Sequence, residues 1–302
     1  MEMHDAESHR YCGRLFSADE IQRIRNLTAA EPKRNRAQLS REVCDILGWL
    51  RPDGRLKDMS CRVAMIRMER DGLITLPPPQ QRNGNGRHRP RFTPASEPED
   101  PISLPAGRLG DLTFRIVENR RDSSLWNELI ERYHYLGYKP LPGAQLRYFI
   151  FSGPRLLAAL GFGASAWKVA PRDRFIGWDS QARSQNLHLV VNNARFLILP
   201  WVTSKNLASR ILSAVAKRLP LDWEKRYGYA PALLETFVEQ DRFRGTCYRA
   251  ANWVDVGETQ GRGKLDRRHR NSLPVKTILI YPLRRDFRRQ LCFPSMPQQG
   301  KS

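Results

Sequence analysis

The stretch LLETFVEQDRFRGTCYRAANWVDVGETQGRGK, residues 233–264, decides the class of fold. With the alanine before it, the stretch opens on an apolar run over 232–239, which predicts a buried strand. A short helix is predicted over 243–253 and another strand over 254–258. Strand, helix and strand in close succession are typical of an α/β domain. One carboxylate, Glu235, lies inside the apolar run and needs a partner there.

The same alternation extends over residues 109–302, which we expect to form one domain. Apolar runs predict five further strands, and helical periodicity predicts two longer helices. The strands are expected at 112–118, 145–151, 155–167, 187–200 and 275–283, and the helices at 123–136 and 206–219. This order indicates an α/β fold with a mixed central sheet flanked by helices.

A separate helical domain is predicted over residues 1–77. Ser17 and Glu20 have the spacing of a capping box, so a first helix is expected to begin there. A second helix is predicted over 36–48, and a third begins at Asp58, a good N-cap residue. The third helix is expected to turn inward the apolar side chains Met59, Val63 and Ile66.

A short strand, Leu73–Leu76, is predicted after the third helix. Three helices followed by such a strand are typical of a winged helix-turn-helix domain, whose last helix enters the major groove of DNA. The expected DNA contacts are basic residues in this helix and just before it, namely Arg55, Lys57, Arg62 and Arg67. The alternative is a helical docking module whose basic face is only solvated.

Residues 78–108 are predicted to link the two domains, because they are rich in Pro, Gly and Asn and lack apolar periodicity. The arginine and histidine side chains of this segment either lie along phosphates or only keep a tether soluble.

The charge of the chain points to a polyanionic partner. The 302 residues include 51 Lys and Arg against 31 Asp and Glu, a formal net charge of +20. Such a field attracts nucleic acid and makes binding dependent on salt. We therefore expect DNA, double- or single-stranded, as the partner.

Several other classes of protein are excluded. No apolar run reaches the roughly eighteen residues of a spanning helix, so we expect no membrane partner. Five cysteines without a CxxC pair argue against a disulfide framework and a zinc knuckle, and they fit a reducing cytoplasm. No spacing of His, Cys and Asp predicts a metal site, although a divalent metal cofactor is left open.

Three residues are candidates for chemistry. A buried Glu235 requires a cation, and Arg195, on the strand expected beside it, is the predicted partner in a structural ion pair. The alternative makes Glu235 a general base or metal ligand in a basic cleft. His134 ends a predicted helix and is a candidate general acid or base, or only a cap. Cys247 lies beside arginines, which are expected to lower its thiol pKa, unless it is a small core residue.

A further set of side chains has the chemistry of a nucleic-acid interface. Tyr248 offers stacking and Asn252 offers hydrogen bonds to base edges. Phosphate contacts are expected from a second group, comprising Arg242, Arg244, Arg249, Arg262, Lys264, Arg267 and Arg268. The last four of these follow a glycine-arginine-glycine turn and form a basic edge of the expected site, or else only a basic loop.

Several strings resemble the Druantia anti-phage protein DruA family. They are GRLKDMSCRVAMIRMERDGLITLPPP, HYLGYKPLPGAQLRYFI, NNARFLILPWV, NLASRIL and the stretch quoted first. The related domain also occurs with transposases. The resemblance implies an intracellular prokaryotic protein that acts in phage defence, with other defence proteins as partners, or on mobile DNA. It implies no catalytic mechanism.

The order of elements over 110–283 resembles the GNAT N-acetyltransferase fold. That resemblance implies a glycine-rich bend after the long strand, where backbone amides hold the pyrophosphate of acetyl-CoA. The junction here is PWVTSKNLAS, residues 200–209, and its lack of glycine disfavours acetyl-CoA as a cofactor. Lys205 is expected to bind a nucleic-acid phosphate at this junction, with ordinary helix capping by Ser204 as the alternative.

Together these features predict a DNA-binding protein of phage defence or of mobile elements, which holds nucleic acid with a winged helix and a basic cleft on a GNAT-like domain. One alternative is an enzyme that cuts nucleic acid or transfers strands or groups with the help of Glu235. Another is a CoA-dependent N-acyltransferase.

Overall fold

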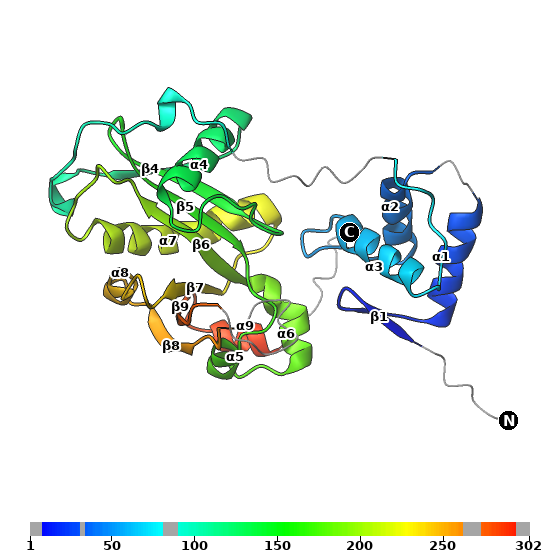
Figure 1. Ribbon diagram of the computed structural model, residues 1–302. Coiled ribbons are helices and arrows are strands. Elements are labelled where there is room, and N and C mark those ends of the chain that lie inside the picture. The colour runs from blue at the N-terminus through cyan, green and yellow to red at the C-terminus, as the bar shows by residue number, and fades with distance from the viewer. Residues whose placement is uncertain (1–7, 31–33, 81–89, 262–272, 294–302) are drawn as a thin grey trace, which may run out of the picture. The chain divides into compact units, whose positions relative to one another are not determined.

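The structure is a computed structural model that describes residues 8–30, 34–80, 90–261 and 273–293. The chain divides into two compact units, one over residues 1–87 and one over 88–302 (Figure 1). No helix of the described residues is long and apolar enough to cross a membrane.

The first unit contains a short hairpin and three helices. The hairpin pairs β1 (His9–Tyr11) with β2 (Arg14–Phe16) in antiparallel fashion, and α1 (Ala18–Ala30), α2 (Arg36–Ile46) and α3 (Asp58–Arg70) follow. The predicted capping box is confirmed, because Ser17 Oγ accepts from the Glu20 amide while Glu20 accepts from the Ser17 amide, both at 3.2 Å. The core of this unit gathers apolar side chains from all these elements, among them Phe16, Ile24, Leu39, Val43, Met65 and Met68.

The packing face of α3 differs from the prediction. Met59, Val63 and Ile66 are 56%, 39% and 42% exposed. The buried face instead carries Cys61, Ala64, Met65 and Met68. Both sets recur at helical spacing, so the sequence alone does not distinguish them. Packing against α2 and the hairpin selects the second set.

The predicted wing is not confirmed. Residues 71–80 contain no strand, and the two-stranded sheet of this unit precedes α1. The segment after α3 is held by side chains, since Glu69 accepts from the Leu76 amide at 3.0 Å and Arg36 donates to the Pro77 carbonyl at 2.7 Å. The connection from α2 to α3 covers residues 47–57, which is longer than the turn of a helix-turn-helix motif.

The second unit is built on one mixed seven-stranded sheet, in the order β3-β4-β5-β6-β7-β9-β8 (Figure 1). All neighbouring strands are antiparallel except β6 and β7. The strands are β3 (Leu112–Ile116), β4 (Leu146–Ser152), β5 (Arg155–Ala164), β6 (Val190–Ile198), β7 (Leu233–Glu239), β8 (Val254–Glu258) and β9 (Lys276–Pro282). The predicted α/β class, its mixed sheet and each of its predicted strands are confirmed.

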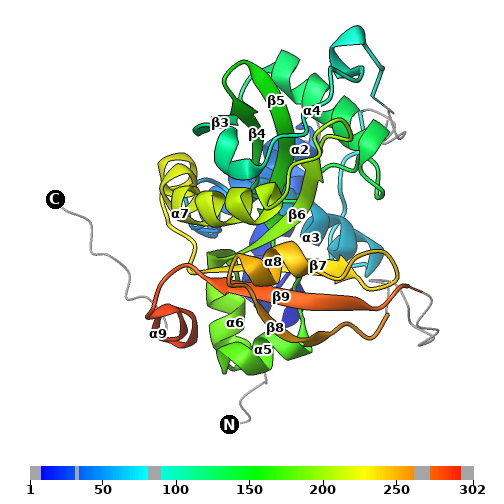
Figure 2. The same ribbon diagram turned by 90° about the vertical axis from the view of Figure 1, so that its left-hand side faces the viewer.

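Helices cover both faces of this sheet. They are α4 (Arg120–Tyr133), α5 (Ala170–Ile176), α6 (Ser180–Asn186), α7 (Leu207–Tyr227), α8 (Thr246–Ala250) and α9 (Phe287–Cys292). Three single 3₁₀ turns lie at Pro94–Ser96, Ala106–Arg108 and Leu187–Leu189. Figure 2 shows α5, α6 and α9 grouped near β8 and β9. These three helices had no clear sequence signal, because each is only six or seven residues long.

Side-chain contacts assign α4 and α7 to opposite faces of the sheet. The Tyr148 hydroxyl donates to Asp222 of α7 at 3.0 Å, and Leu160 is the strand partner of Tyr148. The next residue of β5, Gly161, points to the other face, where Trp126 of α4 lies. A Cβ at Gly161 would be 2.9 Å from the Trp126 ring, so the glycine permits this close approach.

Part of the predicted linker packs on the second unit. The Thr93 amide and hydroxyl both donate to Glu128, at 2.9 and 2.8 Å, and the Ile102 amide donates to the Trp201 carbonyl at 2.8 Å. Glu128 and Ile102 are both buried, so each needs these partners. The low apolar periodicity of 78–108 therefore does not mark a free tether along its whole length.

Candidate functional site

The candidate site lies where β6 and β7 separate. Their parallel pairing covers Val190–Asn192 and Leu233–Glu235, after which both strands continue. Beyond the pairing a cavity of about 470 Å³ opens between them. The end of α4 and the start of α8 complete its walls, and Figure 2 shows α8 beside β6 and β7.

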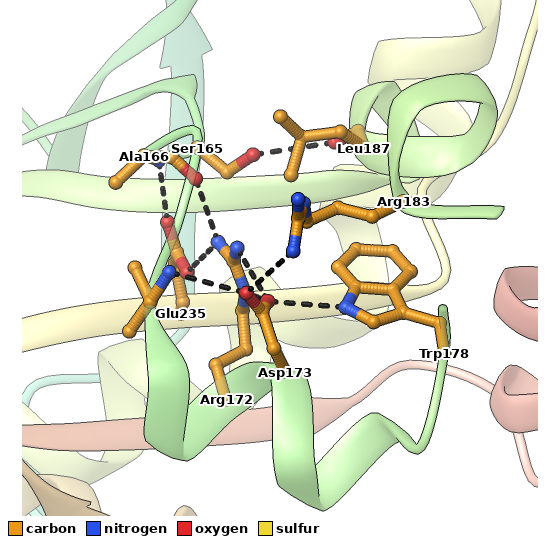
Figure 3. A network of polar contacts seen from close by, with 9 residues as sticks. Ser165, Ala166, Arg172, Asp173, Trp178, Arg183, Leu187 and Glu235 are labelled. Carbon is orange, nitrogen blue, oxygen red and sulfur yellow. Dashed lines mark hydrogen bonds and ion pairs between the residues drawn. The ribbon is translucent and has the colours of Figure 1, made fainter. Parts of the chain in front are cut away.

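The paired end of the two strands holds a buried ion pair (Figure 3). Glu235 and Arg172 are both 0% exposed, and Arg172 Nη1 donates to Glu235 Oε2 at 2.8 Å. The Ala166 amide donates to Glu235 Oε1 at 3.0 Å. Arg172 also donates to Asp173, which in turn accepts from the Trp178 indole at 3.0 Å.

The predicted pairing of Glu235 with Arg195 is therefore wrong. Asn192 is the strand partner of Glu235, so Arg195 lies three residues further along β6, where the strands have separated. Arg172 comes instead from α5, in the segment between β5 and β6. The prediction of a buried carboxylate with a cationic partner is confirmed, with a different cation.

The surroundings of Glu235 favour its structural interpretation. Burial raises the pKa of Glu235, while Arg172 and the Ala166 amide act in the opposite direction. Both carboxylate oxygens already accept hydrogen bonds, and no part of the residue meets solvent. A general base needs an oxygen within reach of its substrate, and Glu235 does not offer one.

Arg195 has a different environment. It is 8% exposed and donates to the carbonyls of Ala194 and Gly137, at 2.7 and 3.4 Å. Its Nε is buried without a partner, and no carboxylate among the described residues pairs with it. Burial lowers the pKa of Arg195. The open end of the strands thus contains a buried cation that is uncompensated by a protein anion.

Two hydrogen bonds hold the cavity together from within. The Tyr248 hydroxyl donates to Asn193 Oδ1 at 2.7 Å, and the Thr236 hydroxyl donates to the Asn193 carbonyl at 3.0 Å. Tyr248 is only 7% exposed and packs edge-on against Trp253. Its ring lines the cavity, so it does not provide the surface stacking that the sequence indicated.

His134 lines the cavity as a neutral imidazole. Burial and then the positive charge of Arg195 lower the pKa of His134 to about 4. Its Nδ1 accepts from the Leu136 amide at 3.2 Å, which assigns the ring proton of the neutral form to Nε2. The described residues provide no partner for Nε2. His134 is therefore a hydrogen-bond donor at pH 7, with no carboxylate bonded to it.

Cys247 does not have the lowered pKa that its neighbours in sequence indicated. Burial raises the pKa of its thiol. The Arg249 guanidinium is paired with Asp255 at 2.7 Å, so that carboxylate, and not the Cys247 thiol, is the partner of its positive charge. Cys247 remains a half-buried thiol in the cavity wall.

Exposed aromatic and basic side chains surround the opening of the cavity. Tyr135 and Phe243 are 38% and 49% exposed, and their ring centroids are 5.2 Å apart. The Arg242 guanidinium lies over the Tyr135 ring at 5.5 Å and also pairs with Glu239 at 2.8 Å. Arg244 is exposed and lines the cavity. We call Tyr135, Arg242, Phe243 and Arg244 the rim.

The remaining predicted contacts are distributed over the molecule. Asn252 and Arg249 are exposed around the end of α8. Lys205 is exposed before α7, where the neighbouring Ser204 is half-buried and its hydroxyl does not cap the helix. Arg262, Lys264, Arg267 and Arg268 lie outside the described residues, although the Leu273 amide and the Gly261 carbonyl join the flanks of their segment at 2.9 Å.

The basic residues of the first unit are on and before α3. Arg55 and Arg67 are exposed and Lys57 is half-buried. Arg62 is 30% exposed and lies 3.8 Å from Asp58. These residues belong to the first unit, and the cavity belongs to the second.

Several site residues were missed from the sequence. Tyr135 and Phe243 each neighbour an arginine or histidine in the chain, which is a weak signal of an interface. Arg172 lies in a segment without clear periodicity, so nothing local indicated its pairing. Among the described residues, no three His, Cys, Asp or Glu side chains are placed to hold a metal ion.

Comparison with known proteins gives one family and several similar structures. Residues 67–273 match the family described as Druantia protein DruA. A search of curated proteins found no similar sequence.

The similar structures include aminoglycoside acetyltransferase AAC(6')-Ib with coenzyme A, at 14% identity and a TM-score of 0.39, covering 59% of this chain and 98% of that one. They also include the ribosomal-protein-S18-alanine N-acetyltransferase from Escherichia coli, at 10% identity and a TM-score of 0.35, covering 63% and 100%. Likeness at this level says nothing of activity.

Proposed function

The chain belongs to the Druantia DruA family, which supports a role in defence against phage, and on this premise we propose that it binds nucleic acid. The rim is the observation that carries the proposal. Two exposed aromatic rings and two arginines surround one opening on the second unit. The five cysteines are free, so we place this activity in the reducing cytoplasm.

The rim has the chemistry of a single-stranded nucleic-acid site. Exposed aromatic rings stack on unpaired bases, and arginines bind the phosphates between them. Arg242 lies over the Tyr135 ring, so a cation that can bind a phosphate and a ring that can stack on a base are adjacent. A duplex would not offer its base faces, which is why we propose an unpaired strand here.

The first unit supports a second contact, with duplex DNA. The exposed face of α3 combines Arg67 and Arg70 with the apolar side chains Met59, Val63 and Ile66. Arginines bind phosphates or guanine edges, and apolar side chains contact thymine methyl groups in a major groove. The formal net charge of +20 favours both contacts.

The test is strand binding by fluorescence anisotropy over a salt series, with labelled single- and double-stranded oligonucleotides. Phe243→Ala and Arg244→Ala are expected to weaken single-strand binding by roughly fivefold to a hundredfold, because each removes a stacking or phosphate contact. Matched controls are Phe92→Ala and Arg120→Ala, which remove an exposed ring and an exposed charge elsewhere on the unit. If the rim variants and the controls bind equally well, the proposal is wrong.

A further inference from the structure

We propose that the cavity between β6 and β7 receives one unpaired nucleobase of the bound strand, while its sugar and phosphates remain at the rim. The inference rests on the proposed strand binding and adds what the cavity itself recognises.

The first argument is the composition of the walls. The cavity is lined largely by flat or apolar side chains, including Leu136, Phe196, Ile198, Val238 and Tyr248. Its volume of about 470 Å³ is within the range of small-molecule sites. Among the described residues that line it there is no carboxylate, and the single cation is Arg244 at the opening. The part of a ligand that enters is therefore neutral and planar, as a nucleobase is.

The second argument is the small number of free polar groups inside. The Thr236 hydroxyl donates to the Asn193 carbonyl. The Asn193 side chain accepts from Tyr248 and donates to backbone carbonyls of β5 and β6, so neither side chain is available to a ligand. His134 Nε2 remains as a donor, because Nδ1 of the neutral ring accepts from the Leu136 amide. A base presents ring nitrogens and carbonyl oxygens along its edge, and one donor suits such an acceptor.

The third argument is the charge behind the wall. Arg195 is buried and has no carboxylate partner among the described residues, and its charge reaches His134. Its positive field, which also acts on Tyr135 of the rim, favours the electron-rich edge of a base over an ammonium group. Arg242 and Arg244 are exposed at the opening, where a phosphodiester is expected. Apart from Arg244 the lining carries no charged side chain, which suits a neutral base attached to an anionic backbone.

The experiment uses the full chain and single-stranded oligonucleotides that carry one 2-aminopurine, a base whose fluorescence rises when it leaves a stack. A change in this fluorescence is expected on binding. Ala194→Trp, which fills the cavity from β6, is expected to abolish the change while strand affinity falls by no more than about tenfold, since the rim remains. Ala250→Trp, at an exposed position of α8, is the matched control.

A second measurement does not depend on a variant that folds. Cys247 lines the cavity, so a base within it is expected to slow alkylation of this thiol by N-ethylmaleimide, followed by peptide mass spectrometry. Cys292, half-buried beside α5, reports any general effect of the strand. Acetyl-CoA is tested in the same assay.

The outcomes separate the inference from the proposed function. Strand binding with unchanged 2-aminopurine fluorescence and unprotected Cys247 overturns the inference and leaves the proposed function intact. Absence of strand binding overturns both. Protection of Cys247 by acetyl-CoA and not by the strand also overturns the inference, because the cavity would then belong to an acyl donor.

Discussion

The two ends of the β6–β7 pair differ in how their polar groups are satisfied. At the paired end, Glu235 and Arg172 are fully buried and every carboxylate oxygen has a donor. At the open end, Arg195 is buried without a carboxylate and His134 Nε2 has no partner among the described residues. Burying a charge is costly unless it is paired, so the first arrangement serves stability and the second points to a ligand.

This contrast also separates structural residues from binding residues that are neighbours in the chain. Glu235 lies within ten residues of the rim residues Arg242, Phe243 and Arg244 in the chain, yet Glu235 is fully buried and these three are exposed. We therefore expect substitutions at the paired end to change folding and substitutions at the open end to change binding.

The largest expected effect is the loss of the buried cation. Arg172→Met leaves Glu235 charged and unpaired, so the free energy of unfolding should fall by about 3–5 kcal/mol. Urea unfolding followed by circular dichroism measures this. The double variant Arg172→Met/Glu235→Leu should be more stable than Arg172→Met, because it removes the uncompensated charge. Equal stability of wild type and Arg172→Met would remove the difference between the two ends.

A smaller effect is expected where the sheet meets α4. A Cβ at Gly161 would be 2.9 Å from the Trp126 ring, so Gly161→Ala should cost about 1–3 kcal/mol. Gly163→Ala is the matched control on the same strand, because its Cβ would meet Leu141 at an ordinary 3.5 Å. Thermal unfolding of the two variants compares them, and equal losses would contradict the packing of α4 on β5.

The open end should show its own dependence on pH. The pKa of His134 in the folded protein is about 4, below its ordinary value of 6.5, because of burial and Arg195. Between these two values the unfolded chain binds more protons, so stability should fall as pH decreases from about 6.5 to about 4.

His134→Gln tests this dependence, since it removes the titrating group and should make the fall shallower. Urea midpoints at pH 7, 5.5 and 4.5 are compared between the variant and the wild type. Parallel curves would show that His134 titrates at its ordinary pKa, and thus that the open end is not the desolvated site described above.

The smallest expected effect on stability is at the rim. Arg244 is exposed, so Arg244→Ala should change the free energy of unfolding by less than about 0.5 kcal/mol. The proposed loss of strand binding would then occur without loss of folding. A large destabilisation would mean that the rim has a structural role, and would weaken the distinction between the two ends.

Most of the secondary structure of the second unit was predictable from the sequence. Apolar runs located β3 to β7 and β9, because alternation and burial are written in neighbouring residues. The strand β8 was predicted from its place after the short helix. The capping box at Ser17 was predictable for the same reason, since its hydrogen bonds span three residues. The burial of Glu235 followed from the apolar run around it.

The candidate site was predictable only in part. Arg242, Arg244, His134 and Cys247 were singled out and do meet at one cavity, but Tyr135 and Phe243 were not. Which residues meet depends on strand register and on the separation of β6 from β7, and neither is a local property of the chain.

Neighbouring residues thus specify the strands β3 to β9, the longer helices and the need of Glu235 for a cation. Long-range packing settles that Arg172 supplies that cation, that Arg195 lies apart, and that α3 buries Met65 and leaves Met59 exposed. Periodicity along one element shows which side chains share a face, because it depends only on residues close together in the chain. The choice of partner, by contrast, depends on contacts between residues far apart in the chain.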